Sequence, residues 1–147
     1  MPKVLIAEDD LMIADLIEDI LVGNGYEVCG IARTVEEAVA LGRLYRPDLA
    51  ILDLHLADGG YGTDVAARLS DIPHLGILYA TGNAPLLMKH AARGHACLGK
   101  PYRDNDLLRS LEIVAGLVAT GLALPPFPRG FQILPSAATA TGEPFHG

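Results

Sequence analysis

The sequence has few cysteines and no long apolar segment. Its 147 residues include two cysteines, Cys29 and Cys97. Both fall in predicted strands, so we expect two reduced thiols in the core rather than a disulfide or a metal pair. No apolar run reaches transmembrane length without a charge or a glycine, and the N-terminus lacks a basic stretch followed by an apolar core. These absences predict a cytoplasmic protein without a membrane partner.

Basic residues are also scarce. The net charge is −7 with histidines neutral, and the basic residues form no block. This balance argues against a nucleic-acid partner, because such surfaces concentrate lysine and arginine on one face. The five histidines are scattered, and no set of cysteine and histidine has the spacing of zinc ligands.

The chain does contain enough apolar material for one domain. Half of its residues are hydrophobic and a fifth are charged, as in ordinary globular proteins. Apolar runs of strand length alternate with helical patterns along the chain. The expected strands are 3–7, 26–32, 49–54, 75–80 and 96–99, and the expected helices are 11–22, 34–45, 63–70, 86–93 (one or two turns) and 104–124. This alternation predicts an α/β fold with a doubly wound, five-stranded parallel sheet and helices on both faces.

The composition changes near residue 122. We expect one domain over residues 1–122 and a flexible C-terminal tail over 123–147, because the tail lacks periodicity and is rich in proline, alanine and glycine. The tail also holds a few apolar residues, which could pack on the domain or on a partner. These residues are Phe127, Phe131, Ile133 and Leu134.

Polar residues gather where the predicted strands end. Three acids follow the first strand, an acid closes the third, a hydroxyl follows the fourth and a lysine follows the fifth: Glu8, Asp9, Asp10, Asp53, Thr81 and Lys100. In open parallel sheets the working site lies outside the carboxyl ends of the strands. Each residue alone is explained equally well as a helix cap or as the first polar residue after a buried strand. Agreement across four strands favours a shared site.

Phosphoryl transfer is the chemistry that this group of residues favours. Two carboxylates about 4 Å apart repel by roughly 4 kcal/mol at an effective dielectric near 20. A hard cation such as Mg²⁺ relieves that repulsion, and carboxylates are its preferred ligands. Asp53 would be the nucleophile and would form an aspartyl-phosphate. Lys100 would neutralise charge on the transferred group, and Thr81 would donate a hydrogen bond to it.

Together, the motifs Glu8-Asp9, Asp53, Thr81-Gly82 and Lys100-Pro101 resemble those of receiver domains of bacterial two-component response regulators. The resemblance covers about residues 3–120. It implies a flavodoxin-like fold with strand order 2-1-3-4-5. It also implies that Asp53 accepts a phosphoryl group from a histidine kinase or a histidine phosphotransfer protein.

The resemblance also implies roles for the neighbouring residues. Asp9 and Asp53 would bind Mg²⁺ directly, Glu8 largely through water, and His55 through its backbone carbonyl. Lys100 would contact the phosphoryl group, and its peptide bond to Pro101 would be cis. These roles require no function for the His55 imidazole.

One position departs from the family pattern. Receivers usually carry tyrosine or phenylalanine three residues before the lysine, as a switch that moves with the threonine, and Cys97 occupies that place. The stretch 78–83 is similar to an atypical subgroup with Phe-Ala-Thr-Gly after the fourth strand and no aromatic in the fifth. Tyr79 stands for that phenylalanine, and Asn83 stands where an aromatic is usual.

The sequence therefore supports one leading hypothesis and two alternatives. The first is a stand-alone receiver that signals by phosphorelay or by binding an unidentified downstream protein, and that catalyses only its own phosphorylation and dephosphorylation. The resemblance adds a homodimer through the fourth and fifth helical segments. The second is a degenerate receiver that binds a partner constitutively. The third is a phosphohydrolase, which usually needs a second acid two residues after the nucleophile, where His55 stands.

Overall fold

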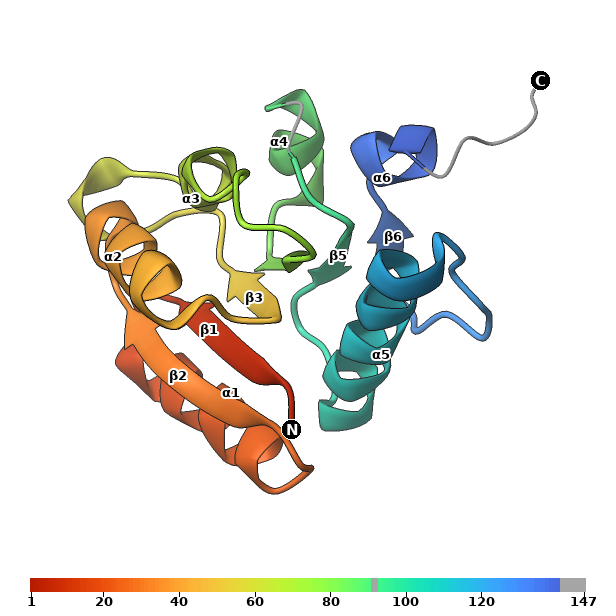
Figure 1. Ribbon diagram of the computed structural model, residues 1–147, viewed down its shortest axis with the longest axis horizontal. Coiled ribbons are helices and arrows are strands. Elements are labelled where there is room, and N and C mark those ends of the chain that lie inside the picture. Colours follow the sequence, from red (N-terminus) through yellow and green to blue (C-terminus); the bar gives the residue numbers. More distant parts are fainter. Residues whose placement is uncertain (91–92, 141–147) are drawn as a thin grey trace.

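Strands and helices alternate along most of the chain. The computed structural model describes residues 1–90 and 93–140 (Figure 1). Its elements are β1 (Lys3–Ala7), α1 (Leu11–Val22), β2 (Glu27–Ala32), α2 (Val35–Tyr45), β3 (Leu49–Leu52), the 3₁₀ turn η1 (Ala57–Gly59), α3 (Gly62–Arg68), β4 (Gly76–Thr81), α4 (Ala84–Lys89), β5 (Ala96–Gly99), α5 (Asp104–Thr120), β6 (Phe131–Ile133) and α6 (Pro135–Ala140). Within these residues, no helix combines the length and the apolar composition needed to cross a membrane.

Five parallel strands form the body of the sheet. Their order is β2-β1-β3-β4-β5, so the predicted α/β fold and strand order are confirmed. The pairs β1–β3 and β3–β4 are in register, with Ala7 opposite Leu52 and Leu52 opposite Tyr79. This register brings the carboxyl ends of the central strands to one edge of the sheet, which is where a site in such a fold is expected.

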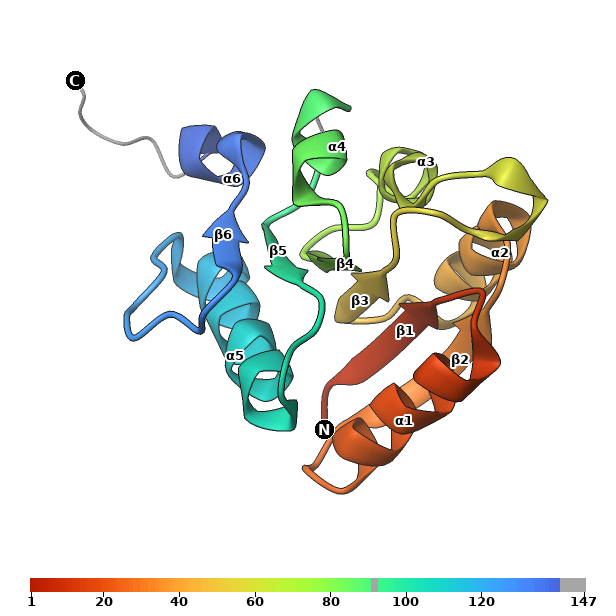
Figure 2. The same ribbon diagram turned by 180° about the vertical axis from the view of Figure 1, so that it is seen from behind.

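The sheet is covered on both faces. Helices α1 and α5 pack on one face over a buried cluster that includes Ile6, Ile51 and Leu111. Helices α2, α3 and α4 pack on the other face over a cluster that includes Leu52, Leu69 and Leu87. Figures 1 and 2 show α1 and α2 on opposite sides of the β1–β2 pair. The central strands are therefore buried on both sides, which explains why they are apolar without alternation.

Side-chain caps set the starts of three helices. Asp10 accepts hydrogen bonds from the first-turn amides of α1, and Thr34 accepts one from the Glu37 amide in α2. Asn83 accepts from the Leu86 amide, so α4 begins at residue 84, two residues earlier than predicted. Pro85 lies in its first turn, where a missing N–H removes no helical hydrogen bond. The predicted end of this segment includes residues 91–92, which lie outside the described residues.

The C-terminal region differs from the prediction of five strands and a flexible tail. A sixth strand, β6, pairs antiparallel with β5 at the edge of the sheet, and α6 follows it (Figure 1). Phe131 and Leu134 are buried on opposite faces of the sheet, and Phe127 stays half exposed. Local composition missed this strand because its stability comes from pairing with a distant sheet edge. Residues 141–147 of the predicted tail lie outside the described residues.

Candidate functional site

Three carboxylates meet at the carboxyl ends of β1 and β3. Glu8 and Asp9 follow β1 and Asp53 follows β3, and one oxygen of each lies within 4.8 Å of the others. Residues from two non-adjacent stretches of sequence are thereby brought together as predicted. The resulting acidic cluster is Glu8, Asp9 and Asp53.

Glu8 is the most buried member of the acidic cluster. Its side chain is 4% exposed, and its two oxygens accept from the Asp10 amide at 3.1 Å and from the Lys100 ammonium at 3.1 Å. Burial raises the pKa of Glu8 to about 7, and the charge of Asp53 adds to this rise; the Asp10 amide and Lys100 oppose it. Keeping Glu8 ionised in this buried position therefore costs free energy. A second cation at the cluster, in addition to Lys100, would lower that free-energy cost.

Asp53 is more accessible than Glu8. Its side chain is 16% exposed, and one of its oxygens accepts from the Leu54 amide at 2.8 Å. Gly62, at the start of α3, lies against its backbone: a Cβ there would stand 2.2 Å from the Asp53 carbonyl oxygen. Only glycine fits at that position, so Gly62 helps to fix the loop that carries the carboxylate. The sequence reasoning did not identify this packing role.

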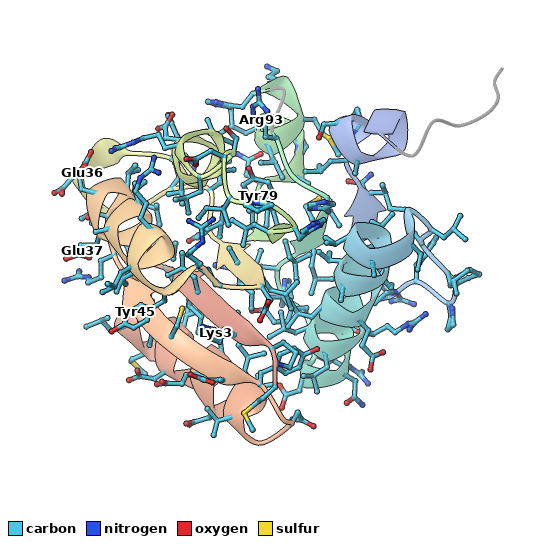
Figure 3. The ribbon with its side chains drawn as sticks, viewed as in Figure 1. Lys3, Glu36, Glu37, Tyr45, Tyr79 and Arg93 are labelled. Atoms are coloured by element: carbon cyan, nitrogen blue, oxygen red, sulfur yellow. The ribbon has the colours of Figure 1, made fainter. Side chains whose placement is uncertain are left out.

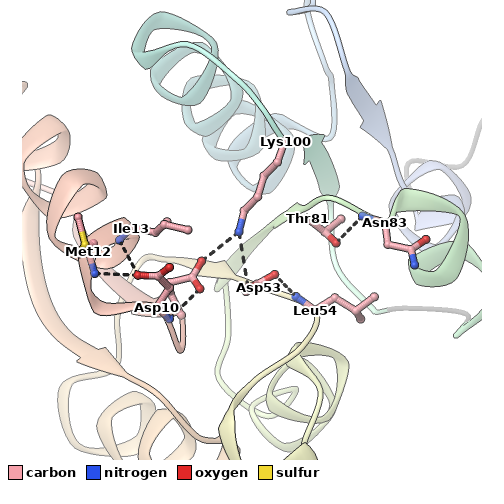
Figure 4. A network of polar contacts seen from close by, with 9 residues as sticks. Asp10, Met12, Ile13, Asp53, Leu54, Thr81, Asn83 and Lys100 are labelled. Atoms are coloured by element: carbon pink, nitrogen blue, oxygen red, sulfur yellow. Dashed lines mark hydrogen bonds and ion pairs between the residues drawn. The ribbon is translucent and has the colours of Figure 1, made fainter.

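Lys100 joins the acidic cluster from β5. Its Nζ lies 3.1 Å from Glu8 Oε1 and 3.6 Å from Asp53 Oδ2 (Figure 4). Its backbone amide donates to the Thr81 carbonyl at 2.9 Å, and its peptide bond to Pro101 is cis. The lysine is therefore held at the backbone while its ammonium group reaches both acids.

Thr81 is buried at the end of β4 and is bound to its own loop. Its Oγ1 accepts from the Asn83 amide at 3.0 Å (Figure 4). Because this contact uses an oxygen lone pair, the hydroxyl proton can be donated to a ligand. Asn83 in turn caps α4, so hydrogen bonds connect the threonine to the start of that helix. In the sequence, Asn83 was noted only as an unusual residue after the glycine. Its position directly before Ala84-Pro85 could have identified it as the N-cap of a helix.

His55 stands two residues after Asp53, in the loop before η1. Its ring lies 5.4 Å from the Tyr61 ring, which lies 4.9 Å from the His90 ring of the α4 C-cap. The imidazole thus contributes to a row of tilted ring contacts between the β3 loop and the end of α4. The predicted role of its backbone carbonyl in metal binding remains a prediction.

Cys97 is buried in the middle of β5. It pairs with Tyr79 on one side and Gln132 on the other, and its Sγ lies 3.9 Å from Gln132 Oε1. Burial raises the pKa of its thiol. The Tyr79 hydroxyl donates to the Arg93 carbonyl, so the buried aromatic residue of this region comes from β4 (Figure 3).

An apolar groove of about 880 Å³ runs beside the acidic cluster, between α1 and the loop after β5. It is lined by Ile13, Leu16, Ile17, Ile20, Lys100 and Tyr102, among others. Burial and then the charge of Glu8 raise the pKa of Tyr102 to about 12. Leu11, Met12 and Leu16 of α1 are at least half exposed. Helix α1 has more apolar residues than one buried face requires. This pattern indicates an exposed apolar surface, which was not predicted from the sequence.

The acidic cluster fits a divalent cation. It offers oxygen ligands only, one of them on a buried acid whose pKa is raised by burial and by a neighbouring carboxylate. Hard cations such as Mg²⁺ select such all-oxygen sites and are held by one or two carboxylates plus waters. Glu8, Asp9 and Asp53 are therefore the residues that would hold Mg²⁺.

Comparison with known sequences identifies the same family that the motifs resemble. The sequence profile of the response regulator receiver domain matches residues 4–112. The chain is 33% identical over 114 residues to the transcriptional regulatory protein PdtaR of Mycobacterium tuberculosis, which is 76% of this chain and 55% of PdtaR. It is 36% identical over 80 residues to the phyllosphere-induced regulator PhyR of Methylorubrum extorquens, which is 54% of this chain and 30% of PhyR. The chain thus spans about half, or less, of the length of these relatives.

Solved structures agree with this result. The signal receiver domain of a modulated diguanylate cyclase from Desulfovibrio desulfuricans G20 has a TM-score of 0.70 and 30% identity, covering 83% of this chain and 99% of that one. A CheY-like receiver domain protein from Methanospirillum hungatei JF-1 has a TM-score of 0.70 and 26% identity over the same shares. The profile match contains the acidic cluster, Thr81 and Lys100, and it ends before β6.

Proposed function

This chain belongs to the response regulator receiver domain family, and we propose that it accepts a phosphoryl group on Asp53 in the cytoplasm. The donor is the phosphohistidine of a histidine kinase or of a histidine phosphotransfer protein. The observation that carries this proposal is the meeting of Asp53 with Glu8, Asp9 and Lys100 at the carboxyl edge of the sheet. Receiver domains are signalling modules, and the proposed output is binding of another protein or onward phosphoryl transfer.

The proposed reaction is a displacement at phosphorus. A carboxylate oxygen of Asp53 attacks the phosphorus while the phosphorus–nitrogen bond of the donor histidine breaks, and the electron pair stays on the imidazole. Lys100, 3.6 Å from Asp53, is placed to neutralise the oxygens of the transferred group, and Thr81 supplies a hydroxyl donor. Mg²⁺ held by the acidic cluster would add positive charge at the same oxygens.

The apolar surface of α1 supports docking of the donor beside Asp53. Leu11, Met12 and Leu16 of α1 are exposed, and Leu16 lines the 880 Å³ groove that reaches Lys100 and Tyr102. Exposed apolar side chains next to a polar reactive group are typical of a protein-binding surface. The proposed contact is the apolar face of a helix that carries the phosphohistidine.

Phosphorylation by acetyl phosphate tests the proposal. We expect Mg²⁺-dependent labelling of the wild-type chain, detected as an acid-stable, hydroxylamine-sensitive mass increase, and no labelling of Asp53→Asn. Asp58→Asn is the matched control: Asp58 is exposed in the neighbouring turn at a φ of 66°, which asparagine tolerates, so its labelling should be unchanged.

Other outcomes would select another function. Equal labelling of Asp53→Asn would refute the assignment of the site. Absence of Mg²⁺ binding in a calorimetric titration would favour a degenerate receiver that binds its partner constitutively. Multiple turnover of a phosphate ester would favour a phosphohydrolase.

A further inference from the structure

The outer edge of β5 is occupied by the C-terminal segment of the chain itself. Leu98 pairs with Phe131 and Ala96 with Ile133. Backbone hydrogen bonds flank these pairs, from the Gly99 amide to the Gly130 carbonyl and from the Leu134 amide to the His95 carbonyl, both at 3.0 Å. An exposed strand edge presents a row of such groups and binds extended segments through them. The β5 edge is therefore chemically able to accept a strand.

Side-chain contacts give this edge selectivity. Phe131 is buried with the α1–α5 cluster, and Ile133 packs against the same cluster. Leu134 is buried in the opposite cluster, and Gln132 contacts Cys97, which belongs to that same cluster. A strand bound here must therefore present apolar, polar, apolar and apolar side chains in succession.

The C-terminal segment is attached mainly through its first residues. Among the residues whose burial is described, Phe131, Leu134 and Ala137 are buried, and the Ser136 hydroxyl donates to the Gly94 carbonyl at 3.0 Å. The loop before it is tied to α5 by Arg109, which donates to the Leu124 and Pro126 carbonyls. The entropic cost of ordering these residues offsets part of the gain from burying their side chains, so the net free energy that holds the segment is smaller than its contacts alone suggest. Because the segment lies after α5, it can leave without disturbing the five parallel strands.

We propose that the β5 edge is a strand-accepting interaction surface and that β6 is its resident strand. The partner is a protein that presents an extended segment with the pattern of residues 131–134, and it binds antiparallel to β5 after β6 has been released. Gly99, at one end of this edge, directly precedes Lys100, so the partner would lie next to the acidic cluster. The proposal does not depend on phosphorylation of Asp53.

Cys97 is the proposed reporter of β6 release, because its buried thiol lies 3.9 Å from Gln132 Oε1 of that strand. We would use the full chain carrying Cys29→Ser, which leaves Cys97 as the sole cysteine. Leu134→Asp places a charge in an apolar site and should raise the rate of Cys97 thiol labelling by about tenfold or more. An unchanged rate in the folded variant would overturn the proposal.

A synthetic peptide of residues 129–137 is the probe for the free edge. We expect it to bind the Leu134→Asp chain about tenfold more tightly than the parent, since the parent edge is occupied, and to slow Cys97 labelling again. The matched control is the same peptide with aspartate at the positions of Phe131 and Leu134, which should not bind. Failure of the first peptide to bind a chain whose Cys97 is exposed would refute strand acceptance.

Hydrogen exchange in the unmodified chain gives a test that does not rely on a variant. The Leu134 amide donates to His95, and the Lys100 amide donates to Thr81 within the parallel sheet. If β6 is released separately, the Leu134 amide should exchange about tenfold faster or more. Equal protection of the two amides would show that β6 opens only with the whole domain, which contradicts the proposal.

Discussion

The acidic cluster and the β5 edge are linked by the Gly99-Lys100 step, because Lys100 contacts the cluster and Gly99 ends the edge, yet the two regions are built from different interactions. The acidic cluster and Lys100 bring together charged side chains from three strand ends that a buried sheet holds in place. The β5 edge is closed by backbone hydrogen bonds and a few apolar side chains from the end of the chain. The acidic cluster needs specific residue types. The β5 edge needs only an extended segment with the apolar pattern of residues 131–134, so another segment can take the place of β6.

Lys100→Ala gives the largest predicted effect and separates the two regions. We expect phosphorylation by acetyl phosphate to slow by roughly 10²–10³-fold, because the ammonium group that neutralises the transferred oxygens is lost. Cys97 labelling should stay within about twofold of the parent, since the contacts of β6 are unchanged. Lys89→Ala, on the exposed side of α4, is the control for loss of a lysine. A large rise in Cys97 labelling would show instead that the two regions are tightly coupled.

The same difference explains what the sequence could predict. Glu8, Asp53, Thr81 and Lys100 each follow an apolar run, so strand boundaries alone placed them at one edge of a parallel sheet. The burial of Glu8 and the cap made by Asn83 are tertiary details that strand boundaries do not contain. Strand order was therefore sufficient to place acids at this edge, whereas the choice of Glu8 and Asp9 over Asp10 came from the family resemblance.

The β5 edge could not be predicted in the same way. Pairing of β6 uses backbone groups, which every residue has, and its apolar residues stand among prolines that favour an unpaired tail. Cys97 was expected to be a reduced core thiol and was noted for replacing the usual aromatic residue. The structure shows that Gln132 contacts this thiol and that buried Tyr79 comes from the neighbouring strand. These contacts depend on strand order and register, which local patterns do not specify.

Leu111 and Leu134 allow a direct comparison of the domain core with the C-terminal segment. Both side chains are buried, at 0% and 1% exposure. Leu111→Ala should lower the free energy of unfolding by about 3 kcal/mol, because α5 cannot move to fill the cavity. Leu134→Ala should cost less than about 1 kcal/mol, because release of the segment limits the loss to its small docking free energy. Urea denaturation measures both, and equal losses would mean that β6 is part of the cooperative core.

His95 should make stability near β5 depend on pH. Its Nδ1 accepts from the Ile77 amide, and burial lowers the pKa of the imidazole. As pH falls below about 6.5, the unfolded chain binds a proton that the folded chain resists, so this contribution to stability is lost. Protonation would also remove the acceptor of the Ile77 amide, at a cost of roughly 1 kcal/mol.

His95→Asn isolates this contribution, because its amide oxygen can accept the Ile77 hydrogen bond without titrating near neutral pH. Glu8 acts in the opposite direction: its folded pKa of about 7 is raised, so acidification from pH 7 towards its unfolded value of 4.5 adds stability without metal. The parent should therefore lose more stability than His95→Asn between about pH 7 and pH 5 in urea titrations. Parallel curves would contradict the assigned role of His95.

Arg109→Ala gives the smallest predicted effect and tests the loop that precedes β6. The guanidinium donates to the Leu124 and Pro126 carbonyls at 2.7 and 3.1 Å, and it also pairs with Glu112. These contacts are near the surface, so global stability should fall by only about 0.5 kcal/mol. Cys97 labelling should nevertheless rise about twofold to threefold, because that free energy belongs to the docked segment alone. Glu112→Gln removes the ion pair but keeps the carbonyl contacts, and it should leave the labelling rate unchanged. A rise in Glu112→Gln equal to that in Arg109→Ala would place the effect in α5 rather than in the loop.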